Sequence, residues 1–150
     1  MILCVKTNAD NADFKKLVAL LDEELAIRDG IENDFYAQFN KIDAIKYAIV
    51  AYENEIPVGC GAIKPFSEKA MEVKRMFILP EKRGKGIASV VLKELESWAK
   101  ELGNESCVLE TGNKQPEAIE LYKKSGYVII PNYGQYIGVE NSICFRKQIR

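Results

Sequence analysis

One succession of segments in the middle of the chain restricts the possible folds more than any other. An apolar, strand-like run over residues 70–79 is followed by the Gly-rich turn Arg83-Gly84-Lys85-Gly86 and a predicted helix over residues 85–102. Apolar residues recur at helical spacing along that helix, and a second strand-like run covers residues 106–111. A strand, a helix and a strand in this order favour a parallel strand pair joined by a long crossover.

The flanking segments predict further strands and helices in an α/β (α+β) fold. Strands are expected over residues 2–6, 47–52, 56–64, 127–130 and 142–147. Helices are expected from a cap at Asp10 or Asn11 to Gly30, over residues 31–42, and from Pro116 to Gly126. No linker or repeat interrupts the 150 residues, and this length suits one domain around one core. Apart from the parallel pair, the order of these elements predicts antiparallel neighbours.

Composition and charge exclude several classes of protein. The net charge of −1 and the pI of about 5.7 argue against a nucleic-acid binder that relies on overall positive charge. No apolar run reaches the roughly 18 residues of a membrane helix, and residues 1–5 are too short for a signal peptide. The chain has no His and no closely spaced Cys pair, so no metal site is expected. Four cysteines in apolar runs predict buried thiols in a reducing cytoplasm: Cys4, Cys60, Cys107 and Cys144.

The Gly-rich turn has the properties of an anion-binding site. The first turn of a helix presents free N–H groups and a partial positive charge, and preceding glycines let the backbone approach a ligand closely. The turn lacks the G-x-x-x-x-G-K-[ST] pattern of ATP-binding loops, and Ser89 replaces the last glycine of G-x-G-x-x-G. The alternative is a basic surface turn that binds nothing, because such a short pattern arises by chance in about one chain in ten.

Two stretches of the sequence resemble the GCN5-related N-acetyltransferase (GNAT) superfamily. Arg83-x-x-Gly86-x-Ala88 matches the acetyl-CoA motif [QR]-x-x-G-x-[GA], and "LETGNKQPEAIELYKKSGY" is similar to the segment ending in LYxxxGY. The resemblance implies one N-acetyltransferase domain over residues 1–150. It also implies a mixed, mostly antiparallel sheet of six to seven strands, flanked by about four helices. Strands four and five, here 70–79 and 106–111, would splay apart around the pantetheine arm of acetyl-CoA.

The resemblance also implies which residues bind the coenzyme. Backbone groups of the fourth strand would pair with the pantetheine amides: Met76, Phe77 and Ile78. The diphosphate would be held around the Gly-rich turn: Arg83, Gly84, Lys85, Gly86, Ile87, Ala88 and Ser89. Gln115 stands where relatives often place a polar contact to the cofactor, and its alternative role is to cap the following helix.

Amine acetylation requires a group that removes a proton and a group that protonates the leaving thiolate. At pH 7, deprotonating a lysine-like ammonium costs roughly 4 to 5 kcal/mol. By resemblance, Glu72 or Glu110 is the base, although either is alternatively a salt-bridged or edge carboxylate. Tyr122 occupies the position of the family's general acid, and its alternative role is a core aromatic. An N–H group near Phe77 would stabilise the oxyanion.

The acceptor is not specified by the sequence. The acidic residues Asp22, Glu23, Glu24, Asp29, Glu32 and Asp34 either favour a cationic amine or form a solvated helix face. Tyr36, Tyr133 and Tyr136 either wall the acceptor pocket or cover the core. The leading hypothesis is direct transfer from acetyl-CoA to a primary amine of a small molecule, amino acid or protein, in a cytoplasmic protein for which a homodimer is conceivable. The alternatives are a non-catalytic acyl-CoA-binding regulator and an interaction domain without a ligand.

Overall fold

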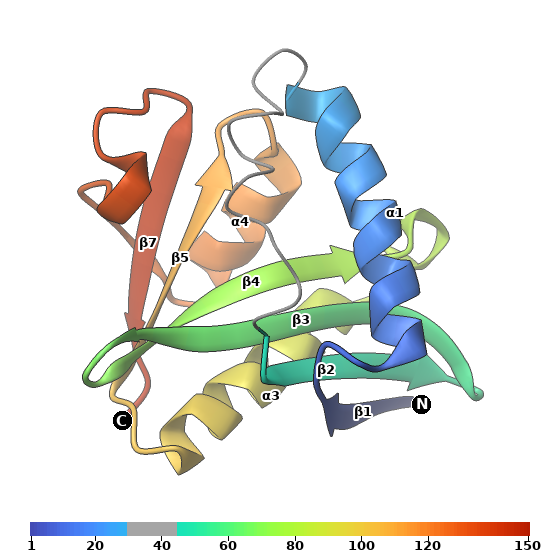
Figure 1. The fold of residues 1–150 in the computed structure, drawn as a ribbon. Helices are drawn as coiled ribbons and strands as arrows, with labels where there is room; N and C mark the ends of the chain where they lie inside the picture. Colours follow the sequence, from blue (N-terminus) through green and yellow to red (C-terminus); the bar gives the residue numbers. More distant parts are fainter. Residues whose placement is uncertain (30–44) are drawn as a thin grey trace.

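The fold is a seven-stranded sheet with helices on both faces (Figure 1). The computed structural model describes residues 1–29 and 45–150. The strands are β1 (Ile2–Thr7), β2 (Tyr47–Glu53), β3 (Ile56–Ser67), β4 (Ala70–Ile78), β5 (Ser106–Gly112), β6 (Val128–Ile130) and β7 (Ser142–Gln148). The α-helices are α1 (Ala12–Asp29), α3 (Ile87–Glu101) and α4 (Pro116–Lys124), and short 3-10 turns cover Pro80–Lys82 and Gly134–Tyr136.

The strand order is β1-β2-β3-β4-β5-β7-β6, and every neighbouring pair is antiparallel except β4–β5, which is parallel. The prediction of a mostly antiparallel sheet with one parallel pair is therefore confirmed. The α3 crossover joins the two parallel strands, as the strand–helix–strand succession predicted.

Element boundaries differ from the expected ones where glycine or local hydrogen bonds decide them. Helix α3 begins at Ile87 rather than residue 85, because Gly84 and Gly86 have φ angles of 79° and 83°. Asn11 caps α1, since its Oδ1 accepts a hydrogen bond of 2.9 Å from the N–H of Phe14. The helix expected over residues 31–42 lies outside the described residues.

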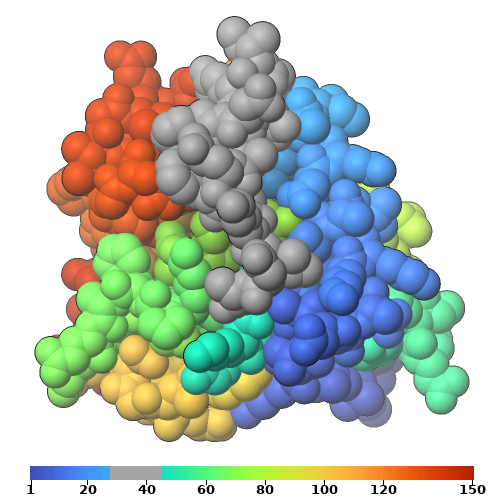
Figure 2. All heavy atoms as spheres, in the orientation of Figure 1, coloured from blue at the N-terminus to red at the C-terminus, as the bar shows by residue number. Residues whose placement is uncertain are grey.

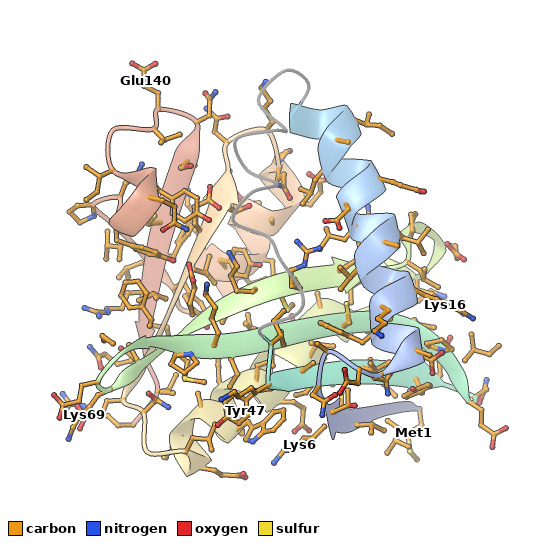
Figure 3. The ribbon with its side chains drawn as sticks, viewed as in Figure 1. Met1, Lys6, Lys16, Tyr47, Lys69 and Glu140 are labelled. Carbon is orange, nitrogen blue, oxygen red and sulfur yellow. The ribbon has the colours of Figure 1, made fainter. Side chains whose placement is uncertain are left out.

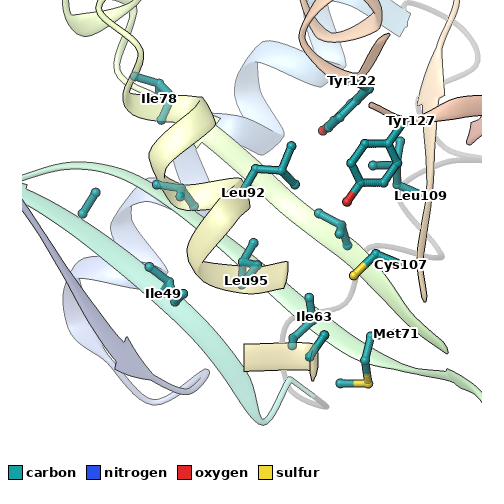
Figure 4. Packing of buried hydrophobic residues seen from close by; sticks show 14 of the residues in the cluster. Ile49, Ile63, Met71, Ile78, Leu92, Leu95, Cys107, Leu109, Tyr122 and Tyr127 are labelled. Carbon is teal, nitrogen blue, oxygen red and sulfur yellow. The ribbon is translucent and has the colours of Figure 1, made fainter. Parts of the chain in front are cut away.

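Two hydrophobic clusters hold the helices on opposite faces of the sheet. On one face, Leu92 and Leu95 of α3 pack among strand residues such as Ile49 and Ile63 (Figure 4). On the other face, the apolar stripe of α1 is buried against β2, β3 and β4: Phe14, Leu17, Val18 and Leu21. Burial of such side chains contributes about 1.5–3 kcal/mol each. The site described below lies where these two layers approach the same end of β4.

The N-terminal edge of the sheet is also tied to α3. The rings of Tyr47 and Trp98 meet edge to face at 5.3 Å, and the Lys6 ammonium lies 5.1 Å from the Trp98 ring centre. Lys6 also pairs with Glu101 at 3.0 Å. Figure 3 shows Lys6 and Tyr47 along the same edge of the sheet, so β1 and β2 share one anchor on the helix.

The cysteines are free thiols, as expected, but they do not all share the predicted burial. Cys60, Cys107 and Cys144 are buried, whereas Cys4 on the edge strand β1 is half-buried, so the prediction was wrong for Cys4. An edge strand has one neighbour instead of two, which leaves part of its side chains open to solvent.

Within the described ranges, no grouping of Cys, Asp or Glu offers three ligands to a metal. None of the described helices is both long and apolar enough to cross a bilayer.

A β-bulge interrupts β4 at Arg75. Cys60 pairs with Phe77 and Ala62 with Lys74, so two β4 residues stand opposite the single β3 residue between these pairs. Arg75 has a φ of 60°, a left-handed conformation that is rare for residues other than glycine. The extra residue shifts the alternation of β4 side chains between the two faces of the sheet. Val73 before the bulge and Ile78 after it pack on the face covered by α3, whereas Phe77 packs on the face covered by α1.

Three residues before the bulge, β4 and β5 stop pairing and diverge. Their paired residues are Ala70 with Ser106, Met71 with Cys107 and, last, Glu72 with Val108. Further along, β4 pairs with β3 and β5 pairs with β7, so the facing edges of residues 73–78 and 109–112 have no strand between them. We call this gap the wedge. The predicted splaying of the fourth and fifth strands is confirmed.

Candidate functional site

A pocket of about 670 Å³ opens between β4, the start of α3 and the helix α4. Most of the residues predicted to bind the coenzyme line it: Met76, Phe77, Ile78, Arg83, Gly84, Gly86, Ile87, Ala88, Ser89 and Gln115. Tyr122 also lines this larger pocket, whereas Lys85 does not. Residues from three separate segments of the chain are therefore brought together at the open end of the wedge.

The N-terminus of α3 faces this pocket without a side-chain cap. Gly86 is the N-cap residue, no side chain hydrogen-bonds to the first turn, and that turn contains no acidic residue. A Cβ atom at Gly84 or Gly86 would meet no atom within 4 Å, so the space before the helix is open. Free N–H groups and the helix dipole at such a position favour an anion.

Arg83 is the motif residue whose side chain is already engaged by the protein. Its Nε donates a hydrogen bond of 2.9 Å to the carbonyl oxygen of Ile78, and its guanidinium pairs with Glu24 of α1 at 2.9 Å. The same group lies 5.4 Å from the ring centre of Phe77. The Arg83 side chain therefore ties the Gly-rich turn to β4 and to α1. What the turn presents to the larger pocket is its backbone.

A smaller pocket of about 110 Å³ adjoins the larger one inside the wedge. It is lined by β4 and β5 together with parts of α1 and α4: Leu21, Leu25, Val73, Lys74, Arg75, Met76, Glu110, Thr111, Gly112, Gln115, Ala118 and Tyr122. Met76, Gln115 and Tyr122 line both pockets, so the two spaces share a wall. Gln115 is the N-cap residue of α4 but makes no side-chain capping hydrogen bond, so the capping alternative is wrong.

Tyr122, on this shared wall, is close enough to Glu110 of the smaller pocket to be influenced by its charge. The buried Tyr122 ring packs near the Tyr127 ring, whose centre lies 5.8 Å away (Figure 4), and near the Phe145 ring, whose centre lies 5.9 Å away. Burial, helped by the nearby Glu110 carboxylate, raises the pKa of the Tyr122 phenol well above its usual value. The phenol is therefore protonated at neutral pH and able to donate a hydrogen bond.

The structure separates the two candidate carboxylates. Glu110 lines the smaller pocket, whereas Glu72 lines neither pocket and is buried beneath the loop before β7. The hydroxyl of Tyr133 donates a hydrogen bond of 2.7 Å to Glu72, and Lys64 lies 3.9 Å from its other oxygen. Tyr133 and the buried Tyr136 thus cover this end of the sheet.

Two of the acidic residues of α1 pair with cations. Asp22 pairs with Arg75 at 2.6 Å, and Glu24 pairs with Arg83. Glu23 is exposed. Of the other members of the predicted acidic run, the Asp29 side chain and the residues Glu32 and Asp34 lie outside the described part of the chain, as does Tyr36. In the view of Figure 2, α1 (blue) lies on the right of the molecule, and the segment around β7 (red) lies on the left.

Sequence reasoning missed two cations at the smaller pocket, Lys74 and Arg75. Their signal was present in the run 70–79, where apolar residues alternate at Met71 and Val73 and then slip by one position at Met76. Such a slip is typical of a bulge. Burial lowers the pKa of the Lys74 ammonium, while the carboxylates of Glu72 and Glu110 oppose that effect.

Comparisons with known proteins agree on one family. A model of the acetyltransferase (GNAT) family matches residues 14–127. A protein of Azospirillum brasilense named IAA acetyltransferase is 39% identical over 89 residues, which are 59% of this chain. The match spans 58% of the length of that relative.

Solved structures share the fold over the whole chain. A candidate acyl-CoA N-acyltransferase of Klebsiella pneumoniae superposes with a TM-score of 0.83 at 26% identity, covering 100% of this chain and 99% of the other. The PaiA N-acetyltransferase of Thermoplasma acidophilum, solved in complex with coenzyme A, gives a TM-score of 0.73 at 18% identity and covers 99% of both chains. At that identity, the second likeness shows the fold alone.

Proposed function

The chain belongs to the acetyltransferase (GNAT) family, and from this premise we propose that it transfers an acetyl group from acetyl-CoA to a primary amine. The transfer proceeds by direct attack of the amine while both substrates are bound. One domain over residues 1–150, a cytoplasmic location and a homodimeric assembly belong to the same proposal.

The observation that carries this proposal is the continuity between an open helix N-terminus and an unpaired strand edge. The turn at Gly84 and Gly86 leaves room for the diphosphate before α3. From there the larger pocket follows residues 76–78 of β4, whose edge toward β5 has no strand partner. An extended pantetheine arm carries amide groups that such an edge accepts as it would accept a strand.

The side chains of Glu110 and Tyr122 suit the proton transfers of the reaction. Glu110 is placed to accept the proton of the incoming ammonium, because it lines the smaller pocket beside Tyr122. Tyr122 donates its proton, or a hydrogen bond, to the departing thiolate. An N–H group of β4 near Phe77 stabilises the negative charge that develops on the carbonyl oxygen. We assign Glu72 a structural role, because Tyr133 and Lys64 already engage both of its oxygens.

Exchanging Glu110 for Gln tests the assignment of the base. We expect kcat/KM to fall about 100-fold near pH 7, in the range general-base catalysis provides. Glu72→Gln is the matched comparison: Gln still accepts a hydrogen bond from Tyr133, so we expect a change of no more than about threefold. Initial rates at saturating acetyl-CoA measure both. A larger loss in the Glu72 variant than in the Glu110 variant would reverse the assignment.

Two measurements test the proposed function itself. Titration calorimetry with CoA should show one site per chain, and a panel of primary amines with acetyl-CoA should release free thiol together with an acetylated product detected by mass spectrometry. Binding without release across the whole panel would favour the non-catalytic regulator. If CoA produced no binding heat and no thermal shift, only the interaction domain would remain.

A further inference from the structure

We propose that the acceptor carries a carboxylate beside its amine, as an α-amino acid does, and that Lys74 and Arg75 bind this carboxylate. The inference rests on the proposed acetyl transfer and names the class of acceptor for the same site. Its basis is the charge distribution of the smaller pocket.

The smaller pocket presents charged groups of both signs. Among the described residues that line it, Lys74 and Arg75 are cationic and Glu110 is anionic. Two further carboxylates act on these cations from outside the lining, since Asp22 pairs with Arg75 at 2.6 Å and Glu72 attracts the Lys74 ammonium. A ligand that carries both an ammonium and a carboxylate would therefore find a group of opposite sign for each of its charges in this pocket.

Arg75 supplies a second, independent observation. Its side chain is 2% exposed, and Asp22 takes only one terminal nitrogen of the guanidinium. Its Nε is buried and has no hydrogen-bond acceptor among residues 1–29 and 45–150. A buried donor without an acceptor is unfavourable, and a guanidinium binds carboxylates well because it offers several donors in one plane. A ligand carboxylate at this wall would provide the missing acceptor after a small adjustment of the side chain.

The strand register places the two signs of charge at a suitable separation. Glu72 is level with Val108 in the parallel pair, so Lys74 stands level with Glu110 across the opening wedge. Adjacent strands lie about 4.8 Å apart, and the gap widens beyond the last pair. A zwitterion that directs its ammonium to Glu110 and its carboxylate to Lys74 spans such a gap, and its amine then lies beside Tyr122.

Matched acceptors test the inference. The probes are alanine, glutamate and lysine as free amino acids, the corresponding α-carboxamides, and the corresponding decarboxylated amines. An α-carboxamide leaves the neighbouring amine less basic than a carboxylate does, so intrinsic reactivity at pH 7 favours the amides. A preference for free acids would therefore come from binding. We expect kcat/KM to be at least 10-fold higher for the best free acid than for its amide and its decarboxylated amine.

Variants of Lys74 connect this preference to the pocket. In Lys74→Gln the ratio of acid to amide should fall toward one, while the CoA affinity stays unchanged. Lys74→Arg keeps the cation and should retain most of the ratio. Lys64→Gln is the control, because this half-exposed cation on β3 lies outside both pockets. Arg75 is left in place, since it also holds Asp22.

The outcomes separate this inference from the proposed function. Equal or faster acetylation of amides and plain amines overturns the inference and leaves the acetyltransferase in place. An acid preference that survives unchanged in Lys74→Gln also overturns the inference alone. Bound CoA without acetylation of any probe or of a wider amine panel overturns the proposed function, and the inference with it.

Discussion

Replacing Gly86 by Glu should weaken CoA binding by roughly 30-fold, as measured by titration calorimetry. The substitution places a carboxylate at the N-cap of α3, where the open space and the free N–H groups would receive the diphosphate. Like charges about 4 Å apart repel by about 1 kcal/mol in water and about 4 kcal/mol near a protein surface. An intermediate value of roughly 2 kcal/mol corresponds to roughly a 30-fold loss of affinity.

The variant Gly86→Ala separates the effect of the added charge from the effect of backbone strain. With a φ of 83° at this position, any Cβ atom costs roughly 1–2 kcal/mol of folding stability, and both variants share that cost. Alanine adds no charge, so its CoA affinity should stay within about fivefold of the wild type. Gly103→Glu, at a φ of 92° just beyond the other end of α3, is a second control for stability alone. Equal affinities for the Ala and Glu variants at position 86 would count against a diphosphate at this turn.

Replacing Tyr122 by Phe should lower kcat by about 100-fold or more and leave the dissociation constant of CoA within about twofold. The loss reflects the absent proton donor, since general acids contribute about 10² to 10⁴ in rate. Because burial raises the pKa of this phenol, it stays protonated from pH 6 to pH 9, so the Tyr122 ionisation should produce no limb in the pH–rate profile over that range. Burst and steady-state assays of thiol release measure the change.

Tyr127→Phe is the matched control for the loss of a buried hydroxyl. The Tyr127 ring packs against Tyr122, but its hydroxyl donates a hydrogen bond of 2.9 Å to Glu96 of α3, and the residue lines neither pocket. We expect this variant to lose about 1.5–3 kcal/mol of stability, because the lost hydrogen bond reaches a carboxylate, and to keep its turnover. A wild-type rate in Tyr122→Phe would remove the general acid from the proposal and leave this ring as a core aromatic.

Much of the candidate site could be predicted from the sequence because its backbone features are local. The spacing of Gly84 and Gly86 before an amphipathic helix predicts an open N-terminus wherever that helix packs. Pro116 and Gly126 bound α4 closely enough to place Tyr122 on its buried side. Such features depend on neighbours within a few residues, and the sequence contains those neighbours.

The roles of the charged side chains were not predictable in the same way. Glu72 and Glu110 look alike in sequence, as single carboxylates in apolar strands. Tyr133, 61 residues away from Glu72 along the chain, engages it, while the divergence of β5 leaves Glu110 at the smaller pocket. Likewise Asp22 pairs with Arg75 across 53 residues. The partner of a charge depends on which distant segments the packed sheet brings beside it.

By itself the sequence determined the order of the described strands and helices, the position of the Gly-rich turn and the family, because periodicity and turn chemistry act over short stretches. Only the tertiary structure decided where β4 bulges, which carboxylate reaches the wedge, and that Lys74 and Arg75 share a pocket with Glu110. The physical reason is that the partners of a charge or a hydrogen-bonding group depend on distances in space. Those distances are fixed only when the helices have packed on both faces of the sheet and β4 and β5 have separated.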